Sequence, residues 1–235
     1  MMKEIGYSWF VEWCREQGYP ITDSQLEGFV QFKENLLDWN SRMNLTAITD
    51  DEGVWQKHFA DSLTLLPFLP PHARSASLLS SESGAEKPLR MIDVGCGAGF
   101  PGLPVKIMRR DISVIMLDSL RKRIFFLEDT ISRLGLEDIE CIHARAEDLA
   151  KEDNHRGQYD ICTSRAVAKL DKLCGWCLPF VKKGGIFLAM KGPNVTDELE
   201  AAKSAIQKMR AEVTEVRLVE ILPGMVHSVV VVGKA

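Results

Sequence analysis

The sequence predicts an α/β protein whose mostly parallel sheet ends in an antiparallel hairpin, with flanking helices and an N-terminal helical extension. From Leu89 onward, short apolar runs alternate with stretches of helical periodicity, which is the pattern of βαβ units. The last two β-rich runs follow each other across the short turn "PGM", which indicates a hairpin that closes the sheet. Residues 1–72 instead repeat apolar side chains at helical spacing.

Seven strands are expected from runs of apolar and β-branched residues. Five belong to the parallel part of the sheet, at 90–94, 113–118, 139–144, 159–164 and 185–191. The two hairpin strands are expected at 215–222 and 227–235. Between the second and third strands, "RKRIFFLEDTISRLGL" carries its apolar residues along one side, and this predicts a helix that packs on the sheet.

The helical extension should contain several helices with recognisable ends. Ser24 followed by Glu27 matches a capping box, which predicts a helix start at that point. A further helix is expected over 54–66, ended by Pro67. The Ser, Ala and Gly-rich stretch 73–88 shows little periodicity and is interpreted as a flexible connection.

Composition limits the class of protein. The 235 residues, 46% of them hydrophobic, fit one globular domain with an appendage, and the net charge of −4 argues against non-specific coating of nucleic acid. Charged residues near the start interrupt any secretory apolar core, and no run reaches the roughly 18 apolar residues of a membrane span. We therefore expect a cytoplasmic protein without a membrane partner, whose six cysteines are free thiols.

Cys174 and Cys177 form a C-x-x-C pattern that could mark a redox pair or half of a zinc site. A redox pair of that kind begins a helix just after a strand, whereas these two residues lie within an amphipathic run. No second ligand pair at zinc spacing accompanies them. The favoured interpretation is two small buried apolar residues, with no metal site.

The stretch "MIDVGCGAGFPGLPVKI" raises the question of which ligand its glycines hold. Gly97, Gly99 and Gly102 match the G-x-G-x-x-G fingerprint, so an NAD-dependent oxidoreductase is one interpretation. However, Asp93 lies just before the loop, and a carboxylate there repels a pyrophosphate and favours a cation. We therefore expect Gly95, Gly97 and Gly99 to form the ligand loop behind Asp93, with Gly102 serving helix packing.

Several motifs resemble those of one enzyme family. "DVGCGAG" resembles the first motif of class I S-adenosylmethionine-dependent methyltransferases, whose Rossmann-like sheet also ends in a hairpin. The motifs "NLTAI", "KHFADSL", "DVGCGAGFPGLPVKI", "LDSLRKR", "ARAEDL", "SRAVAKL" and "KG" occur in the order found in the RsmG (GidB) family. The chain is thus similar, from about Leu36 onward, to bacterial 16S ribosomal RNA guanine-N7 methyltransferases, which implies a methyltransferase domain over 89–235.

The resemblance implies a set of cofactor contacts. Those to S-adenosylmethionine are expected from Gly95, Phe100, Ala146, Glu147 and Arg165. Asp118, a carboxylate at the end of the second strand, is expected to bind ribose hydroxyls in either a dinucleotide or an S-adenosylmethionine site.

The resemblance also implies methyl transfer to N7 of the guanine at position 527 of the RNA. Guanine N7 has a free lone pair and no proton, so positioning should dominate the chemistry and no general base is expected. Arg165, at the carboxyl end of the fourth strand, is the expected positioning residue, through guanine O6 or a phosphate. A structural ion pair is its alternative role.

Polar residues near the expected cleft are the candidates for RNA contact. His58, Asp61 and Ser62 fall on one helical face, and Arg121 to Arg123 follow the second strand, although either group could be an ordinary solvated helix face. Arg145 and Lys191 lie at predicted strand ends. The full set of candidates is Asn44, His58, Asp61, Ser62, Arg121, Lys122, Arg123, Arg145 and Lys191.

The expected substrate partner is 16S ribosomal RNA or a small-subunit assembly intermediate. Three alternative functions remain open. A methyltransferase of the same fold could act on another RNA, a protein or a small molecule. An oxidoreductase would bind NAD, and a non-catalytic RNA-binding module would keep the fold without the reaction. The sequence leaves the oligomeric state open, with a monomer favoured.

Overall fold

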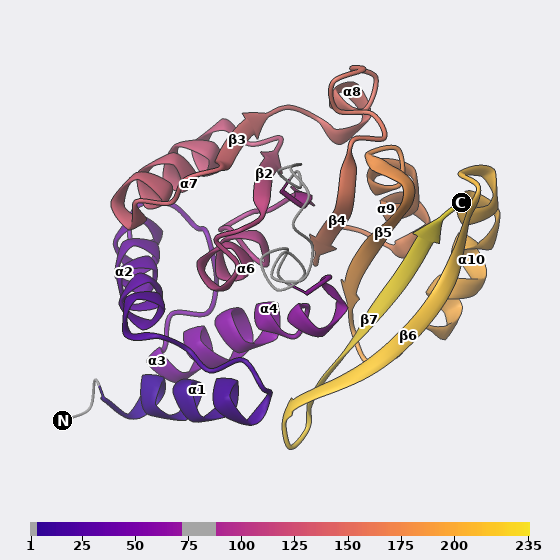
Figure 1. Ribbon diagram of the computed structural model, residues 1–235. Coiled ribbons are helices and arrows are strands. Elements are labelled where there is room, and N and C mark those ends of the chain that lie inside the picture. The colour runs from indigo at the N-terminus through magenta and orange to yellow at the C-terminus, as the bar shows by residue number, and fades with distance from the viewer. Residues whose placement is uncertain (1–3, 72–87) are drawn as a thin grey trace, which may run out of the picture.

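The computed structural model describes residues 4–71 and 88–235, and it builds one seven-stranded sheet with helices on both faces (Figure 1). The strands are β1 (Arg90–Val94), β2 (Ser113–Asp118), β3 (Ile139–His143), β4 (Tyr159–Arg165), β5 (Val181–Lys191), β6 (Ala211–Leu222) and β7 (Met225–Lys234). Their order is β3-β2-β1-β4-β5-β7-β6, with β7 antiparallel to both neighbours. The predicted fold class and all seven predicted strands are confirmed.

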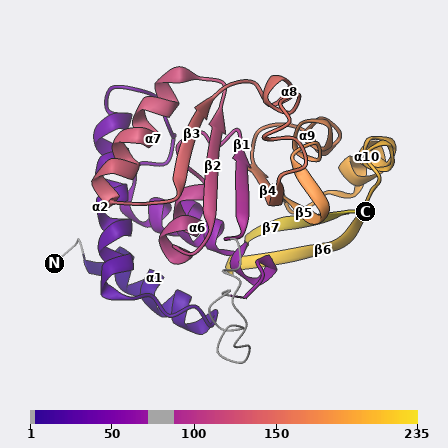
Figure 2. The same ribbon diagram turned by 45° about the horizontal axis from the view of Figure 1, so that its top comes forward.

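The helices fall into two groups that cover opposite faces of the sheet. Figure 2 shows α1, α2, α6 and α7 on one side, and α8, α9 and α10 on the other. The first group is α1 (Glu4–Glu16), α2 (Asp23–Asn40), α3 (Asp51–Gly53), η1 (Val54–Ala60), α4 (Asp61–Leu63), η2 (Leu66–Phe68), α6 (Gly102–Met108) and α7 (Arg121–Leu134). The second is α8 (Ala146–Leu149), α9 (Leu170–Cys177) and α10 (Thr196–Lys208).

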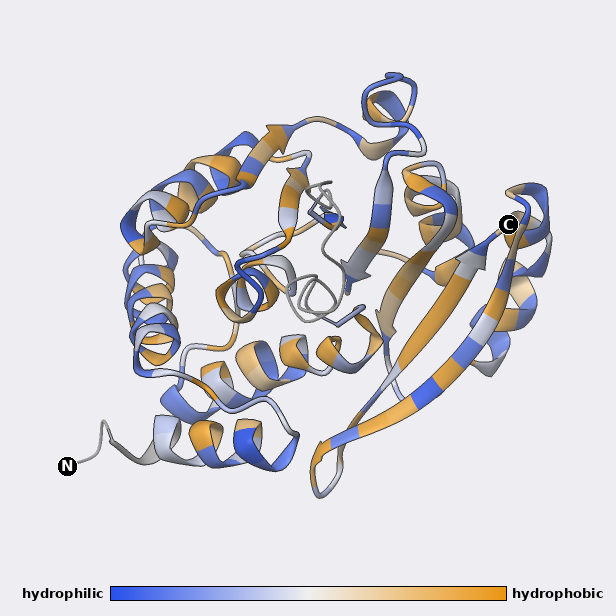
Figure 3. Ribbon diagram, in the orientation of Figure 1, coloured by the Kyte–Doolittle hydropathy of each residue, from blue (hydrophilic) through white to orange (hydrophobic). Residues whose placement is uncertain are grey.

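Strand order places the binding edge of the sheet. From β1 the chain runs outward through β2 to β3, then returns to the opposite side of β1 as β4. The order therefore reverses at β1, and in open α/β sheets ligands bind outside the carboxyl ends of the strands at such a switch point. Strands buried on both faces form nearly continuous apolar runs, as in β1 and β2. Figure 3 shows β7 as a mostly orange strand of the same kind.

The helical extension and the sheet share one hydrophobic core. Phe10 and Phe29 lie 5.0 Å apart between ring centroids, and Phe29 contacts Phe59 at the same centroid distance. Phe32 then stacks on Phe100 of the loop after β1 at 5.2 Å. Because Phe100 belongs to the glycine-rich segment, the extension directly supports the loop that the sequence singles out.

Two local expectations about the extension are wrong. Helix α2 is capped by Thr22, whose hydroxyl accepts from the N–H of Gln25 while the Gln25 side chain accepts from the N–H of Thr22. Ser24 lies inside the helix. The helix predicted over 54–66 begins instead as a π-helix, η1, continues directly into α4 and ends at Leu63. The predicted connection 73–88 lies outside the described residues, apart from its last residue.

A buried hydrogen bond between α2 and α7 gives a test of this packing. Asn35 Nδ2 donates to Thr130 Oγ1 at 2.9 Å, and the Thr130 hydroxyl donates to the carbonyl of Phe126. Thr130→Val keeps the side-chain volume but leaves the buried Asn35 amide without its acceptor. We expect a loss of about 1–3 kcal/mol in the free energy of unfolding, measured by urea titration.

Thr196→Val, at an exposed position in the first turn of α10, is the matched control and should change the free energy of unfolding by less than about 0.5 kcal/mol. Equal losses in the two variants would contradict the role given to the α2–α7 hydrogen bond.

Candidate functional site

The glycine-rich loop leads from β1 into α6 and requires glycine at two places for different reasons. Gly95 has a φ of +72°, and a Cβ there would lie 2.7 Å from a methyl group of Val167. At Gly102 a Cβ would lie 2.5 Å from the sulfur of Met116, so this glycine lets α6 begin against β2. Gly102 thus serves packing, and it lines none of the three pockets described next.

Three adjoining pockets open along the carboxyl ends of the strands. Pocket A lies between β2 and α8 and is lined by Val94, Gly95, Leu117, Asp118, Ser119, Ala144, Arg145, Ala146, Glu147, Val167 and Trp176. Pocket B lies over the glycine loop and is lined by Leu45, Thr46, His58, Gly95, Cys96, Gly97, Ala98, Phe100, Asp118, Ser119, Arg123, Arg165, Ala166 and Val167. Pocket C is lined by Ile48, Lys57, His58, Asp61, Arg165, Ala166, Met190, Lys191, Gly192 and His227.

Asp118 connects pockets A and B and holds the loop in place. One carboxylate oxygen accepts from the N–H of Gly97 at 2.9 Å and from Arg123 Nη1 at 3.1 Å. The other oxygen accepts from the N–H of Leu120 at 2.8 Å. A carboxylate offers about four acceptor sites, so one remains for a ligand hydroxyl beside the three protein donors.

Asp93, near the carboxyl end of β1, lies behind the glycine-rich loop. Its side chain is fully buried, lines none of the three pockets, and accepts from the N–H of Gly102 at 2.9 Å, where α6 begins. Its second oxygen has no hydrogen-bond partner within the described part of the chain. Burial raises the pKa of this carboxyl to about 7, which the hydrogen bond from Gly102 only partly offsets. Asp93 thus makes no direct contact with these pockets, and its expected electrostatic effect on a bound cation stays a prediction.

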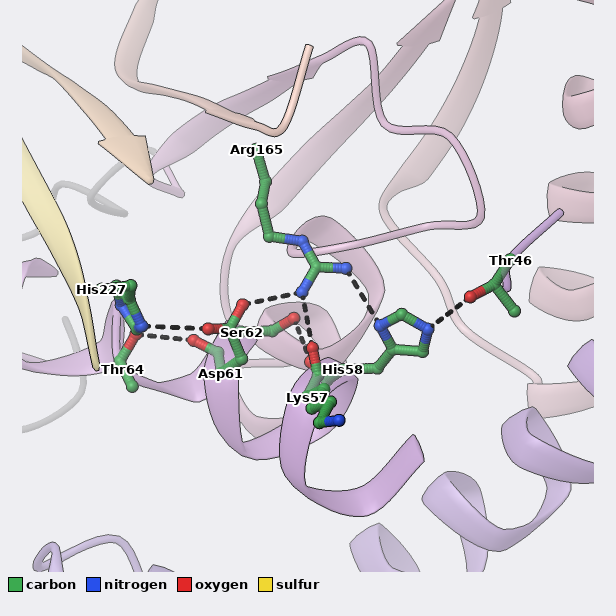
Figure 4. Close-up of polar contacts among 8 residues, drawn as sticks. All are labelled: Thr46, Lys57, His58, Asp61, Ser62, Thr64, Arg165 and His227. Carbon is green, nitrogen blue, oxygen red and sulfur yellow. Dashed lines mark hydrogen bonds and ion pairs between the residues drawn. The ribbon is translucent and has the colours of Figure 1, made fainter. Parts of the chain in front are cut away.

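Arg165, at the end of β4, is held by three residues of the helical extension (Figure 4). Its Nη1 donates to Asp61 Oδ2 at 2.7 Å and to the carbonyl of Lys57 at 3.1 Å. Its Nη2 donates to His58 Nδ1 at 3.3 Å, and the guanidinium carbon lies 5.0 Å from the ring centroid of Phe100. Arg165 therefore forms the boundary between pockets B and C.

The charge states of the neighbours follow from this arrangement. Burial and the positive charge of Arg165 lower the pKa of His58 to about 4, so the ring is neutral at physiological pH. Its Nδ1 then accepts from Arg165, while Nε2 lies 2.8 Å from Thr46 Oγ1. Burial alone would raise the pKa of Asp61, but hydrogen bonds from His227 and Arg165 and their charges lower it below its usual value.

All predicted cofactor residues except Asp93 and Gly99 line pocket A or pocket B. Gly95, Gly97, Phe100, Asp118 and Arg165 line pocket B, and Ala146 and Glu147 line pocket A. Gly99, with a φ of +90°, lines none of the pockets and packs against Leu103 and Leu127.

The predicted RNA contacts divide into three kinds. Ser62 is fully buried and donates to the carbonyl of His58, so the expectation that it faces RNA is wrong. Lys191 lines pocket C, where its side chain is 10% exposed and is held by the Ala168 carbonyl and Glu198. His58, Asp61 and Arg123 lie within the pockets, paired as described above. The exposed members of the set are Asn44, Arg121, Lys122 and Arg145.

Three site residues escaped the sequence analysis. Thr46 and Trp176 line pockets B and A, and His227 reaches pocket C from β7. Trp176 lies between Cys174 and Cys177, where only the cysteine spacing drew attention. His227 precedes a run of valines that reads as an ordinary buried strand, so no local signal marks it.

The cysteines of the C-x-x-C pattern are buried thiols. Cys174 and Cys177 are free and fully buried in α9, and burial raises the pKa of Cys174 to about 12, which agrees with a structural role. Residues 4–71 and 88–235 contain no group of three or more metal-ligating side chains. No helix within these ranges has the length and apolar character to cross a membrane.

The low pKa of His58 predicts a pH-dependent stability. Its folded value of about 4 lies below the ordinary value of 6.5, so between these limits the unfolded chain binds a proton that the folded chain does not. His58 therefore favours folding above pH 6.5, and this contribution declines as the pH falls toward 4. His58→Asn keeps an acceptor near Nδ1 and cannot titrate.

Urea titrations of both proteins should show the wild type losing up to about 3 kcal/mol more than the variant between pH 7 and pH 4. A stability difference that is constant with pH would contradict the buried neutral imidazole.

Comparison with known proteins identifies relatives over most of the chain. A family model described as rRNA small subunit methyltransferase G matches residues 25–222. The curated protein of that name from Clostridium novyi is 43% identical over 215 residues, which cover 91% of this chain and 83% of the relative. Its counterpart from Alkaliphilus metalliredigens is 41% identical over 222 residues, covering 94% and 87%.

A solved structure supports the fold alone. A putative transferase from Pyrococcus horikoshii superimposes with a TM-score of 0.50 at 17% identity, over 63% of this chain and 58% of that one. The family match decides against the NAD-dependent oxidoreductase that the literal glycine spacing had suggested. By its sequence relatives, the chain belongs to the rRNA small subunit methyltransferase G family.

Proposed function

We propose that the protein transfers the methyl group of S-adenosylmethionine to N7 of a guanine in 16S ribosomal RNA, in the bacterial cytoplasm. Family membership supports the reaction class and the small-subunit RNA. The arrangement of polar groups around Arg165 supports N7 as the acceptor atom. The observation that carries this choice is that the acid–base groups at the boundary of pockets B and C already have protein partners.

Pockets A and B fit the methyl donor. Asp118 keeps an acceptor site for a ribose hydroxyl, and Ala146 and Glu147 line the part of pocket A suited to an adenine. At Gly97 a Cβ would meet no atom closer than 3.9 Å, so its missing side chain leaves room for a ligand above the loop. When bound, S-adenosylmethionine supplies an electrophilic methyl group on a sulfonium.

Pocket C adjoins this site and fits the acceptor base. Arg165, His58 and Ala166 line both pocket B and pocket C, so a base in pocket C lies next to a donor in pocket B. Holding both partners at one boundary supplies proximity and orientation, which are the main requirements for displacement at a methyl carbon.

The groups at this boundary are poorly suited to remove a proton. The His58 lone pair accepts from Arg165, and Asp61, held by Arg165 and His227, has a lowered pKa and is therefore a weak base. Methylation of an amino or hydroxyl group requires loss of a proton, whereas N7 forms the new C–N bond with its own lone pair as the C–S bond breaks. The engaged groups therefore favour N7.

Arg165 has donors left for this base. Of its five N–H groups, the protein residues in the described ranges accept from three, two on Nη1 and one on Nη2. The Nε–H and the second Nη2–H lie on the same edge of the guanidinium and form a fork. Guanine O6 has two lone pairs and can accept from such a fork while the N7 lone pair stays free.

Mapping the modified nucleotide tests the proposal directly. The purified protein, S-adenosylmethionine and small subunits from a strain that lacks the gene should give one new cleavage site in N7-specific chemical sequencing of 16S RNA. A methyl group on another atom or on ribosomal protein would overturn the assignment. Bound RNA without methyl transfer, using either naked RNA or subunits, would favour the non-catalytic alternative.

Arg165→Lys tests whether the paired N–H groups of the guanidinium are needed in addition to its positive charge. Lysine keeps the positive charge but cannot donate to Asp61, Lys57 and a base in the same fixed plane. We expect kcat to fall by about a hundredfold, measured by transfer of labelled methyl groups, with a thermal midpoint close to that of the wild type. Parallel losses of activity and thermal stability would assign Arg165 to the structural ion pair alone.

Asp118→Asn tests the ribose contact. The variant loses a charged acceptor, and we expect the Kd for S-adenosylhomocysteine to rise about tenfold or more, measured by calorimetry. Asp38→Asn, an exposed carboxylate paired with Arg42 on α2, is the control and should leave that Kd unchanged. Equal affinities in the two variants would remove Asp118 from the site.

A further inference from the structure

The C-terminal hairpin contributes one side chain to the proposed acceptor pocket. His227 follows Met225 and Val226 at the start of β7, and it lines pocket C. Its Nδ1 lies 3.0 Å from Asp61 Oδ1, and its Nε2 lies 3.1 Å from Thr64 Oγ1. The side chain is only 11% exposed, so water replaces neither contact easily.

The direction of the hydrogen bond to Asp61 follows from the charge of its side chain. Asp61 is a carboxylate with a lowered pKa, so it accepts, and His227 Nδ1 donates. His227 Nε2 faces the Thr64 hydroxyl, which also lies 2.6 Å from the carbonyl of Asp61. The ring is therefore held between two residues of the same helical segment.

Asp61 connects His227 to Arg165. The carboxylate is planar, and its two oxygens are held by Arg165 Nη1 at 2.7 Å and by His227 Nδ1 at 3.0 Å. Figure 4 shows the resulting row from His227 through Asp61 to Arg165 and His58. Without the His227 donor, the Asp61 side chain could rotate about its Cβ–Cγ bond while keeping one bond to Arg165.

We propose that His227 is a positioning residue of the methyl transfer, which fixes Asp61 and thereby the plane of the Arg165 guanidinium. This role rests on the proposed function, in which the free N–H groups of Arg165 hold the acceptor base. His227 touches neither pocket A nor pocket B, so it acts on the chemical step more than on cofactor affinity.

Three substitutions distinguish positioning from packing. His227→Asn keeps a donor near the place of Nδ1 and so retains the bond to Asp61. His227→Gln is closer to histidine in size, but its amide lies near the place of Nε2 and reaches Thr64 instead. His227→Ala removes both contacts.

We expect kcat for RNA methylation to fall about tenfold or more in the Ala and Gln variants, and to stay within about threefold of the wild type in Asn. The Kd for S-adenosylhomocysteine should change less than about threefold in all three. If Gln retains more activity than Asn, or if Asn is as impaired as Ala, the relay through Asp61 is wrong.

A second measurement keeps this inference separate from the proposed reaction. In full-length protein with isotope-labelled arginine and bound S-adenosylhomocysteine, a rigid guanidinium gives separate, slowly exchanging N–H resonances for Arg165. These resonances should merge in the Ala variant and persist in Asn. Unchanged Arg165 resonances in the Ala variant would overturn the positioning role, even if the wild type proved to methylate a different substrate.

Discussion

The ion pair between Arg165 and Asp61 is the constraint on which the site depends, because it joins the end of β4 to the helical extension. Both side chains are more than four-fifths buried, so the pair is shielded from the solvent that weakens exposed ion pairs. Breaking a pair of this kind leaves an uncompensated charge, whereas the intact pair fixes where two pockets meet. The extension is therefore one wall of the site as well as a cover for the sheet.

Much of this could be predicted from the sequence because the relevant signals are local or follow from chain order. Parallel strands such as β1 and β2 are buried on both faces and leave unbroken apolar runs. Their carboxyl ends meet at one edge, so Asp118 and Arg165 could be assigned to a common cleft before any coordinates were known. Thr22 shows the limit even of local signals, since two overlapping capping patterns compete and only packing selects one.

The differences arise where tertiary packing decides what a side chain meets. Asp93 and Ser62 have the right polarity and spacing for a site, but the first is buried against the N–H of Gly102 and the second bonds within its own helix. Helical spacing says which residues share a face and nothing about what that face meets. His227 is the clearest case, because its partner Thr64 is 163 positions away. Such a contact depends on the antiparallel return of β7, which no short motif records.

The π-helical turn η1 has a consequence for how this segment can vary. The N–H of Asp61 reaches back to the carbonyl of Gln56, five residues earlier, where a regular helix would span four. That wider turn lets Trp55 and Phe59 face the core while Lys57, His58 and Asp61 face Arg165. Deleting one residue would turn everything beyond it by about 100° and move core and pocket residues together. The length of this turn is therefore constrained independently of the side chains that it carries.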